Sequence, residues 1–223
     1  KKNLNKPLSA GGWGIKKFNL DDLYIRFFRL AEKRIAEHGG RGVVSFISNH
    51  SWVSDPSFVV LRRHLLDSFD RFWIENMHGN RKISEYAPDG RTSETVFAIP
   101  GFSVGIQQGV AISLWVKHAR REGEPVVRFR DDLSEAKAVE RRTHLLASLD
   151  DKDMDAQYER VQLNAGRRYS FRPGNVSPAF SVWPSLDDLR GLPPTLGILD
   201  NRKEALICPD RERLIARVTK YID

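Results

Sequence analysis

The strongest constraint on the fold is an alternation of helical and strand-like patterns between residues 20 and 77. Apolar residues recur at helical spacing over residues 20–37 and again over 56–69, as they do on helices that cover a core. Two short apolar runs, 42–48 and 71–77, each follow one of these patterns and have the length of buried strands. Helices that alternate with buried strands predict an α/β fold, with the helices packed on a sheet.

Each helical pattern presents one apolar stripe, which we expect to face the sheet. Asn19 is the predicted N-cap of the first helix, and Asp21 and Asp22 are placed where carboxylates favour the helix dipole. The first stripe consists of Leu20, Tyr24, Phe27, Ala31 and Ile35, widened by Leu23 and Phe28, and the second of Phe58, Leu61, Leu65, Leu66 and Phe69.

The later segments predict a hairpin followed by mainly helical structure. Extended patterns near residues 95–99 and 109–117 predict a hairpin that completes the sheet. A charged helix is predicted over 134–149, and a last amphipathic helix begins at Pro209-Asp210. The order helix, strand, helix, strand and hairpin is that of the last part of an α/β sheet.

The composition is that of a folded protein, with 40% hydrophobic and 29% charged residues in a chain of 223. Because the pattern changes near residue 130, we divide the chain into an α/β domain, 1–133, and a smaller mixed or helical region, 134–223. The one cysteine, Cys208, cannot form an internal disulfide, and no apolar run has the length of a membrane span. We therefore expect a cytoplasmic protein that has no membrane partner.

The net charge of +7 comes from 36 Lys and Arg residues against 29 Asp and Glu. Arg is the commoner cation, and its planar fork suits phosphates and base edges. The excess fits a nucleic-acid partner, and it fits equally well a solvated surface on which both signs are interspersed. Charge alone leaves both alternatives open.

Several catalytic motifs are missing from the sequence. The glycines of residues 38–42 follow a helix and precede a strand, whereas a nucleotide-binding loop needs the reverse order. The six histidines and Cys208 show no metal-ligand spacing, and no nucleophile elbow occurs. The sequence therefore indicates no self-contained catalytic centre.

Two polar segments are candidate ligand sites. The first follows the first predicted strand, and ligands of open α/β sheets collect beyond the carboxyl ends of strands. There, Asn49, Ser51 and Trp52 would line a pocket or touch a nucleic-acid strand. In the alternative, which the chemistry alone favours, Trp52 packs against the following helix and Asn49 makes a bond within the turn.

The second segment is the glycine-bounded loop 101–109. Here Phe102 would stack on a flipped base, and Gln107 and Gln108 would form hydrogen bonds with it. The alternative is an ordinary hairpin connection whose glycines serve the geometry of the turn.

Taken in order, six blocks of the sequence resemble adenine-specific DNA methyltransferases. Specifically, they are similar to the large Type I single-polypeptide restriction–modification enzymes, often described as predicted helicases. The similarity extends from about residue 20 to the C-terminus. The blocks are residues 23–35, 42–52, 58–66, 74–80, 107–112 and 199–207.

The resemblance implies that residues 1–133 are the C-terminal half of a methyltransferase-like domain, and that 134–223 are a connector and the beginning of a target-recognition region. Such enzymes bind S-adenosylmethionine through a glycine-rich loop and hold the target adenine with an Asn-Pro-Pro-Tyr-type motif. Neither occurs in this sequence, and both are expected upstream of Lys1. We therefore expect no cofactor and no methyl transfer for the chain alone, and we expect DNA and the missing N-terminal half as its partners.

The resemblance also assigns roles to individual residues. Phe102 would stack on the extruded base, with Phe97 as the second candidate. The residues that would contact phosphates are Arg167, Arg168 and Arg172. For these three residues a solvated basic loop is the alternative.

Two other classes of function remain open at this stage. One is a DNA-binding module without enzymatic activity, in which basic and aromatic loops hold the nucleic acid. The other is an assembly piece whose exposed sheet edge and apolar surface are covered by the missing half.

Overall fold

The computed structural model describes residues 3–6, 10–15, 19–98, 106–174, 179, 182–184, 189 and 208–222. The chain divides into two compact units, Lys1–Gly174 and Asn175–Asp223. The second unit contains helix α6, Arg211–Ile222, which begins where the sequence predicts it. The side chain of Asp210 accepts a hydrogen bond from the backbone N–H of Arg213 and so caps this helix. Among the described residues, no helix is long and apolar enough to cross a membrane.

Among its described residues, the first unit contains three α-helices and five strands. Helix α1 continues into a π-helical segment, Lys33–Gly39, and Gly40 follows it in a left-handed conformation (φ 68°). The helices are α1 Leu23–Glu32, α2 Val59–Ser68 and α3 Ala138–Ala147. The strands are β1 Gly42–Asn49, β2 Arg71–Asn76, β3 Val110–Lys117, β4 Val126–Arg130 and β5 Glu159–Arg160. Short 3-10 turns cover His50–Val53, Pro56–Phe58, Arg81–Ile83, Ser148–Asp150 and Met154–Gln157.

The five strands form one mixed sheet in the order β1-β3-β2-β4-β5. Strand β3 is antiparallel to both of its neighbours, β1 and β2, while β2 and β4 are parallel. Trp115 on β3 lies opposite Val44 on one side and Phe72 on the other, so the three side chains share one face of the sheet. The predicted α/β fold is confirmed.

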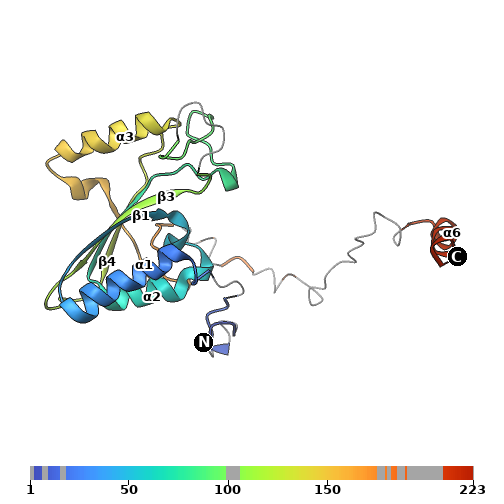
Figure 1. Ribbon diagram of the computed structural model, residues 1–223, viewed down its shortest axis with the longest axis horizontal. Coiled ribbons are helices and arrows are strands. Elements are labelled where there is room, and N and C mark those ends of the chain that lie inside the picture. The colour runs from blue at the N-terminus through green and yellow to red at the C-terminus, as the bar shows by residue number, and fades with distance from the viewer. Residues whose placement is uncertain are drawn as a thin grey trace. The chain divides into compact units, whose positions relative to one another are not determined.

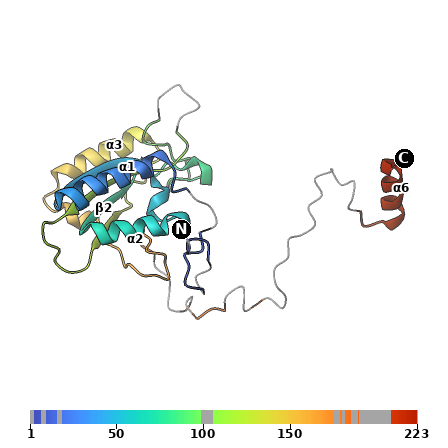
Figure 2. The same ribbon diagram turned by 60° about the horizontal axis from the view of Figure 1, so that its bottom comes forward.

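An aromatic core fills the face of the sheet that α1 and α2 cover (Figure 1). Phe28 of α1 is fully buried and meets Trp115 edge-to-face, with ring centroids 4.8 Å apart. Trp52 contacts the same two rings, at 5.2 and 5.7 Å. Edge-to-face geometry places the positive rim of one ring on the negative face of another. Helix α3 packs on the opposite face, where Leu145 contacts a second, smaller apolar cluster (Figure 2).

The structure confirms the positions of both early strands and of the second helix. Strand β1 is not buried as predicted, because it lies at the edge of the sheet and Val43 and Ile47 are exposed on one of its faces. The predicted hairpin is wrong. Residues 95–98 are irregular, and the strand predicted near 109–117 lies between β1 and β2. Strand β4 was not predicted at all. Its five residues come after a long polar stretch, and Arg128 and Arg130 interrupt the apolar pattern. Arg130 is nevertheless fully buried because it bonds to Asp132 and to Ser148.

The first helix also departs from the prediction. It begins at Leu23 after Asp22, and Asn19 is not its N-cap but accepts a backbone bond from Asp22. Leu23 and Phe27, assigned to the inner stripe, are 72% and 59% exposed. A helix packed on a sheet buries only one side, and here that side is centred on Phe28.

A buried guanidinium joins α2 to the rest of the unit. Arg62 is fully buried, and its four hydrogen bonds all go to backbone carbonyl oxygens. These acceptors belong to Trp52 (2.9 Å), Asp55 (2.9 Å), Arg168 (2.9 Å) and Tyr169 (3.0 Å). Burial lowers the pKa of Arg62 to about 10, so the side chain remains charged at neutral pH. Because four of its five N–H donors are bonded to carbonyl oxygens, the buried charge is tolerated.

We expect Arg62→Ala to lower the free energy of unfolding by about 3–5 kcal/mol, because it leaves a cavity and removes the donors of several buried carbonyls. The matched control is Arg63→Ala. Arg63 is half exposed, and it pairs with Asp67 and stacks on Tyr169. Arg63→Ala should lower the free energy of unfolding by less than about 1 kcal/mol. Urea unfolding of the two variants checks this, and similar costs would contradict the role given to Arg62.

Candidate functional site

The candidate site lies at one edge of the sheet, where β1 and β2 end and β3 begins. Because β3 is antiparallel to both neighbours, Asn49 at the end of β1 is opposite Val110, and Asn76 at the end of β2 is opposite Ala111. The backbone N–H of His50 donates to the carbonyl of Gly109 at 2.9 Å. The turn after β1 and the segment before β3, which the sequence identified separately, therefore meet here. We call this region, where the strands β1 and β2 terminate, the polar edge; it is distinct from the unpaired side of β1.

Two of the predicted site residues contact each other directly at the polar edge. The side-chain amide of Asn49 donates to Oε1 of Gln108 at 2.8 Å, and its Oδ1 accepts from the backbone N–H of Ser51, also at 2.8 Å. Gln107 is exposed beside them, and its carbonyl accepts a bond from the backbone N–H of Arg81. These side chains form a solvent-facing set of amides, the groups that pair with base edges.

Trp52 is not part of this surface. Its side chain is fully buried, and its Nε1 donates to Oγ of Ser48 at 3.1 Å. The 3-10 turn His50–Val53 directs the indole into the aromatic core, where it meets Phe28 and Phe171 edge-to-face. The structure thus gives the alternative that the chemistry favoured, and we remove Trp52 from the proposed contacts.

The three predicted phosphate contacts have different surroundings. Arg172 is exposed and lies at the polar edge, with an ion pair to Asp131 at 3.3 Å. Arg167 donates to the carbonyl of Arg172 at 2.9 Å. Arg168 is half-buried, and its guanidinium lies 3.4 Å from the carbonyl of Trp13. Arg172 and Arg167 are therefore close enough in the structure to act with the polar edge, whereas Arg168 is part of the local scaffold.

Of the two aromatic candidates, Phe97 is among the described residues. Phe102 lies outside the described residues. Phe97 is 45% exposed and lines an apolar groove of about 580 Å³ between α3 and the sheet, together with Ile47, Ile112 and Leu146. This groove is on the opposite face of the sheet from α1 and α2.

A charged network that the sequence did not identify supports the polar edge. His78 follows β2 with a positive φ of 51°, and its Nδ1 lies 2.7 Å from Oε1 of Glu85. Its Nε2 lies 3.3 Å from Oδ1 of Asp131, a carboxylate that also accepts a bond from Asn76 at 2.7 Å. The partners are 7 and 53 residues away in the sequence, and no local sequence pattern pointed to them.

This network fixes the protonation of His78. Burial lowers the pKa of His78, but its hydrogen bonds to Asp131 and Glu85 outweigh burial and raise the value to about 9. Burial raises the pKa of Asp131, and the bonds from His78 and Asn76 lower it to about 2. His78 is therefore an imidazolium between two carboxylates at neutral pH. It holds charge in place and is not a general base under these conditions.

His50 is different in character. Its Nε2 is buried and has no hydrogen-bond partner among the described residues. Burial, together with the charge of Arg172, lowers its pKa to about 4. The imidazole is therefore neutral at pH 7 and presents an unused polar atom beside Gly109.

The described residues do not fit S-adenosylmethionine. Such a ligand needs space above a glycine-rich turn between a strand and a helix. The turn after β1 contains the buried Trp52, and at Gly79 after β2 an added Cβ would already lie 2.5 Å from the carbonyl oxygen of Glu94. Nor do the described residues contain a group of His, Cys, Asp and Glu side chains placed to hold a metal ion.

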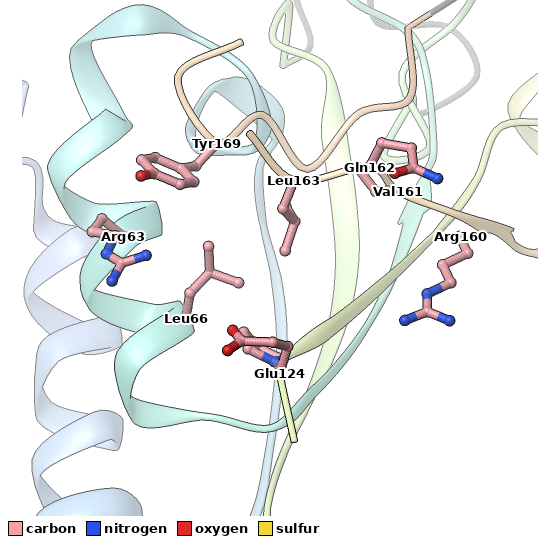
Figure 3. A pocket seen from close by; sticks show the side chains of 9 residues that line it. Arg63, Leu66, Glu124, Arg160, Val161, Gln162, Leu163 and Tyr169 are labelled. Atoms are coloured by element: carbon pink, nitrogen blue, oxygen red, sulfur yellow. The ribbon is translucent and has the colours of Figure 1, made fainter. Parts of the chain in front are cut away.

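A separate pocket of about 360 Å³ lies between α2 and the segment that contains β5 (Figure 3). Leu66 and Leu163 point into it, and the guanidinium of Arg63 lies 5.3 Å from the ring centroid of Tyr169 at its rim. Glu124 and Arg160 add opposite charges to the rim. None of the predicted site residues lines this pocket. It lies near the start of β4, at the other end of the sheet from the polar edge.

No protein-family model and no curated protein matches the sequence. Several solved structures are similar to it, and among them are two that contain DNA. One is the cryoEM structure of a DrdV–DNA complex, with a TM-score of 0.61 and 22% identity, where the match covers 99% of this chain and 21% of that chain. The other is a nuclease-deletion mutant of the Type ISP restriction-modification enzyme LlaGI with a DNA substrate mimic, with a TM-score of 0.51 and 21% identity, covering 67% of this chain and 13% of that chain.

The chain thus spans about a fifth or less of the proteins that it matches. At these identities the likeness is one of fold. It agrees with the α/β class that the sequence predicts.

We expect the charge of His78 to make the free energy of unfolding depend on pH in the alkaline range. Its pKa is raised from 6.5 to about 9, so its contribution of up to about 3 kcal/mol is complete below pH 6.5 and is lost as the pH rises through 9. The difference in unfolding free energy between the unmodified chain and His78→Gln should therefore shrink between about pH 7 and about pH 10. Urea unfolding at a series of pH values measures it.

The control for this measurement is His118→Gln, since the His118 side chain is exposed and has no hydrogen bond or ion pair among the described residues. Its difference from the unmodified chain should stay constant over the same range. A constant difference for His78→Gln as well would rule out the proposed ionic bridge.

Proposed function

We propose that this chain is a DNA-contacting part of a restriction–modification enzyme. The observation that carries the proposal is the likeness of fold between 99% of the chain and a segment of a protein solved in complex with DNA. A second likeness, to a Type ISP restriction-modification enzyme bound to a DNA substrate mimic, agrees with it. The sequence resemblance, which rests on particular blocks of residues, points to the same class of enzyme.

The polar edge is the part of the surface that we assign to DNA. Asn49, Gln107 and Gln108 offer amides for base edges, and Arg172 and Arg167 offer cations for phosphates. The buried His78 bridge holds the turn beneath them, so these groups are positioned before DNA arrives.

In its finer form, the proposal is that the complete enzyme is an N6-adenine methyltransferase. Residues 1–133 would supply the target-base side of its active site, and 134–223 the connector towards a target-recognition region. S-adenosylmethionine and the Asn-Pro-Pro-Tyr-type motif would belong to the preceding half, since the residues described here offer no cradle for the cofactor. This chain by itself would transfer no methyl group.

The missing half would cover the β1 side of the sheet. Strand β1 is an edge strand, because among the described strands it pairs only with β3. Its other side therefore has no partner among them. Val43 and Ile47 of β1 are exposed on the face of the sheet opposite α1, and Phe27 and Leu30 are exposed on α1 itself. An open edge beside exposed apolar side chains is the kind of surface that another part of a protein covers.

A DNA-binding or assembly module without enzymatic activity is the second candidate, and the same apolar surface favours it. The two candidates differ in what the complete polypeptide does. Transfer of a labelled methyl group from S-adenosylmethionine to adenine in duplex DNA supports the methyltransferase, whereas DNA binding without transfer supports the module.

We expect the 223-residue chain to bind a mixed-sequence DNA duplex, with an affinity that falls steeply as salt increases. Each phosphate contact contributes about 0.9 to the slope of log affinity against log salt concentration. Fluorescence anisotropy with a labelled duplex over a salt series measures both quantities. If no binding is seen at low ionic strength, where phosphate contacts are strongest, the DNA-contacting function is wrong.

For the finer proposal, Phe102→Ala is tested in the complete enzyme. If Phe102 stacks on the extruded base, the methylation rate should fall by about tenfold or more, while duplex affinity changes less, because stacking on one base is worth about 1–3 kcal/mol. Phe97→Ala, which changes the second candidate, is compared with it, since Phe97 lines the groove between α3 and the sheet. A larger loss of methylation in Phe97→Ala than in Phe102→Ala would assign the stacking role to Phe97. Equal methylation rates for Phe102→Ala and the unmodified enzyme would refute the stacking role.

A further inference from the structure

The loop Asn80–Tyr86, next to the polar edge, has an anchored backbone. The carboxylate of Glu85, held by His78, accepts a bond from the backbone N–H of Asn80 at 2.7 Å. The N–H of Arg81 donates to the carbonyl of Gln107 at 2.9 Å. Arg81–Ile83 form a 3-10 turn, which Ser84 ends in a left-handed conformation. The outward side chains of this loop are therefore carried by a fixed scaffold.

The solvent-facing side of the loop carries a net positive charge. Its acidic group, Glu85, turns inward to the imidazolium of His78. In the hairpin that follows, Asp89 is paired with Arg91 at 2.6 Å. Arg81 and Lys82 are exposed and have no ion-pair partner in the part of the chain that the structure describes. Two adjacent positive charges therefore face solvent without local compensation.

Two large apolar side chains lie beside these cations. Ile83 is 71% exposed and Tyr86 is 65% exposed. Exposed apolar groups next to unpaired cations match the two parts of a nucleic acid, since the cations meet phosphates and the apolar groups meet bases or sugars. Aliphatic side chains are also the groups that wedge between base steps in the minor groove.

We propose that the loop Asn80–Tyr86 is a second DNA-contacting element, in which Arg81 and Lys82 bind backbone phosphates and Ile83 and Tyr86 pack on bases or sugars. The proposal rests on the DNA-contacting function proposed above and adds a specific surface to it. The hydrogen bond from Arg81 to Gln107 makes this loop continuous with the amides of the polar edge, so the same duplex reaches both.

The test of the cations compares two double variants of the 223-residue chain. The first is Arg81→Ala with Lys82→Ala. The matched control is Arg41→Ala with Arg120→Ala, which removes the same charge from exposed positions at the other end of the sheet, where β1 begins and β3 has ended. Anisotropy with a mixed-sequence duplex over a salt series is recorded for both, and thermal unfolding verifies that each variant is folded.

For the Arg81 and Lys82 variant we expect the slope of log affinity against log salt to become shallower by about 2, with an affinity loss of roughly tenfold or more at about 0.1 M salt. The control should change the slope by less than half as much. Equal changes in the two variants would overturn the proposal, because the loop would then contribute only its net charge.

The apolar contacts are tested by Tyr86→Ala and Tyr86→Phe. Stacking on a base predicts that Tyr86→Ala loses affinity by about 5-fold to about 100-fold with an unchanged salt slope, while Tyr86→Phe keeps the affinity. Ile83→Ser should likewise reduce affinity without changing the slope. If Tyr86→Ala and Ile83→Ser both bind like the unmodified chain, the proposed apolar contact is wrong.

Two outcomes separate this proposal from the function on which it rests. If the unmodified chain binds no duplex at low salt, the DNA-contacting function fails and the loop proposal fails with it. If the chain binds but the Arg81 and Lys82 variant equals its control, only the loop proposal fails. Polyglutamate serves as an acidic competitor, and displacement of the duplex at equal charge concentration would point to an acidic protein surface and overturn DNA as the occupant.

Discussion

The arrangement of the first unit depends on the buried guanidinium of Arg62. Its donors reach the turn after β1 and the turn that ends at Tyr169, so one side chain on α2 joins three segments whose contacts are otherwise mainly apolar. Two further arginines, Arg130 and Arg141, are also fully buried, and Arg141 donates to the carbonyls of Met77 and Glu94. Carbonyl-rich turns can be buried at these places because arginine supplies several donors in one plane.

Part of the net positive charge is not at the surface, because three arginines are buried. Arg62 and Arg141 donate to backbone carbonyls, and Arg130 bonds to Asp132 and Ser148. These side chains are not available to a nucleic acid. The cations that are exposed and unpaired are the ones that are free to bind phosphates. Arg81 and Lys82 are of this kind, whereas Arg168 and Arg172 are partly occupied by contacts within the protein.

The polar edge and the loop beside it share one electrostatic centre. His78 is charged because Glu85 and Asp131 surround it, and the same two carboxylates are kept ionised by His78. Glu85 then anchors the loop backbone, and Asp131 holds Asn76 and Arg172. His78 and Arg172 together balance the charge of these two carboxylates, which leaves Arg81 and Lys82 beside the proposed DNA-contacting surface uncompensated.

The sequence by itself determined the helices and strands whose apolar periodicity is strong, namely α2, β1 and β2, and it placed Asn49 and Gln108 among the site residues. It did not determine that these two residues touch, that Phe27 faces away from the sheet, or that Trp52 is buried. Local periodicity depends only on neighbours along the chain, so it is visible in the sequence. The insertion of β3 between β1 and β2, and the charged bridge from His78 to the carboxylate of Asp131, depend on pairing between distant segments. Only the tertiary structure decided them.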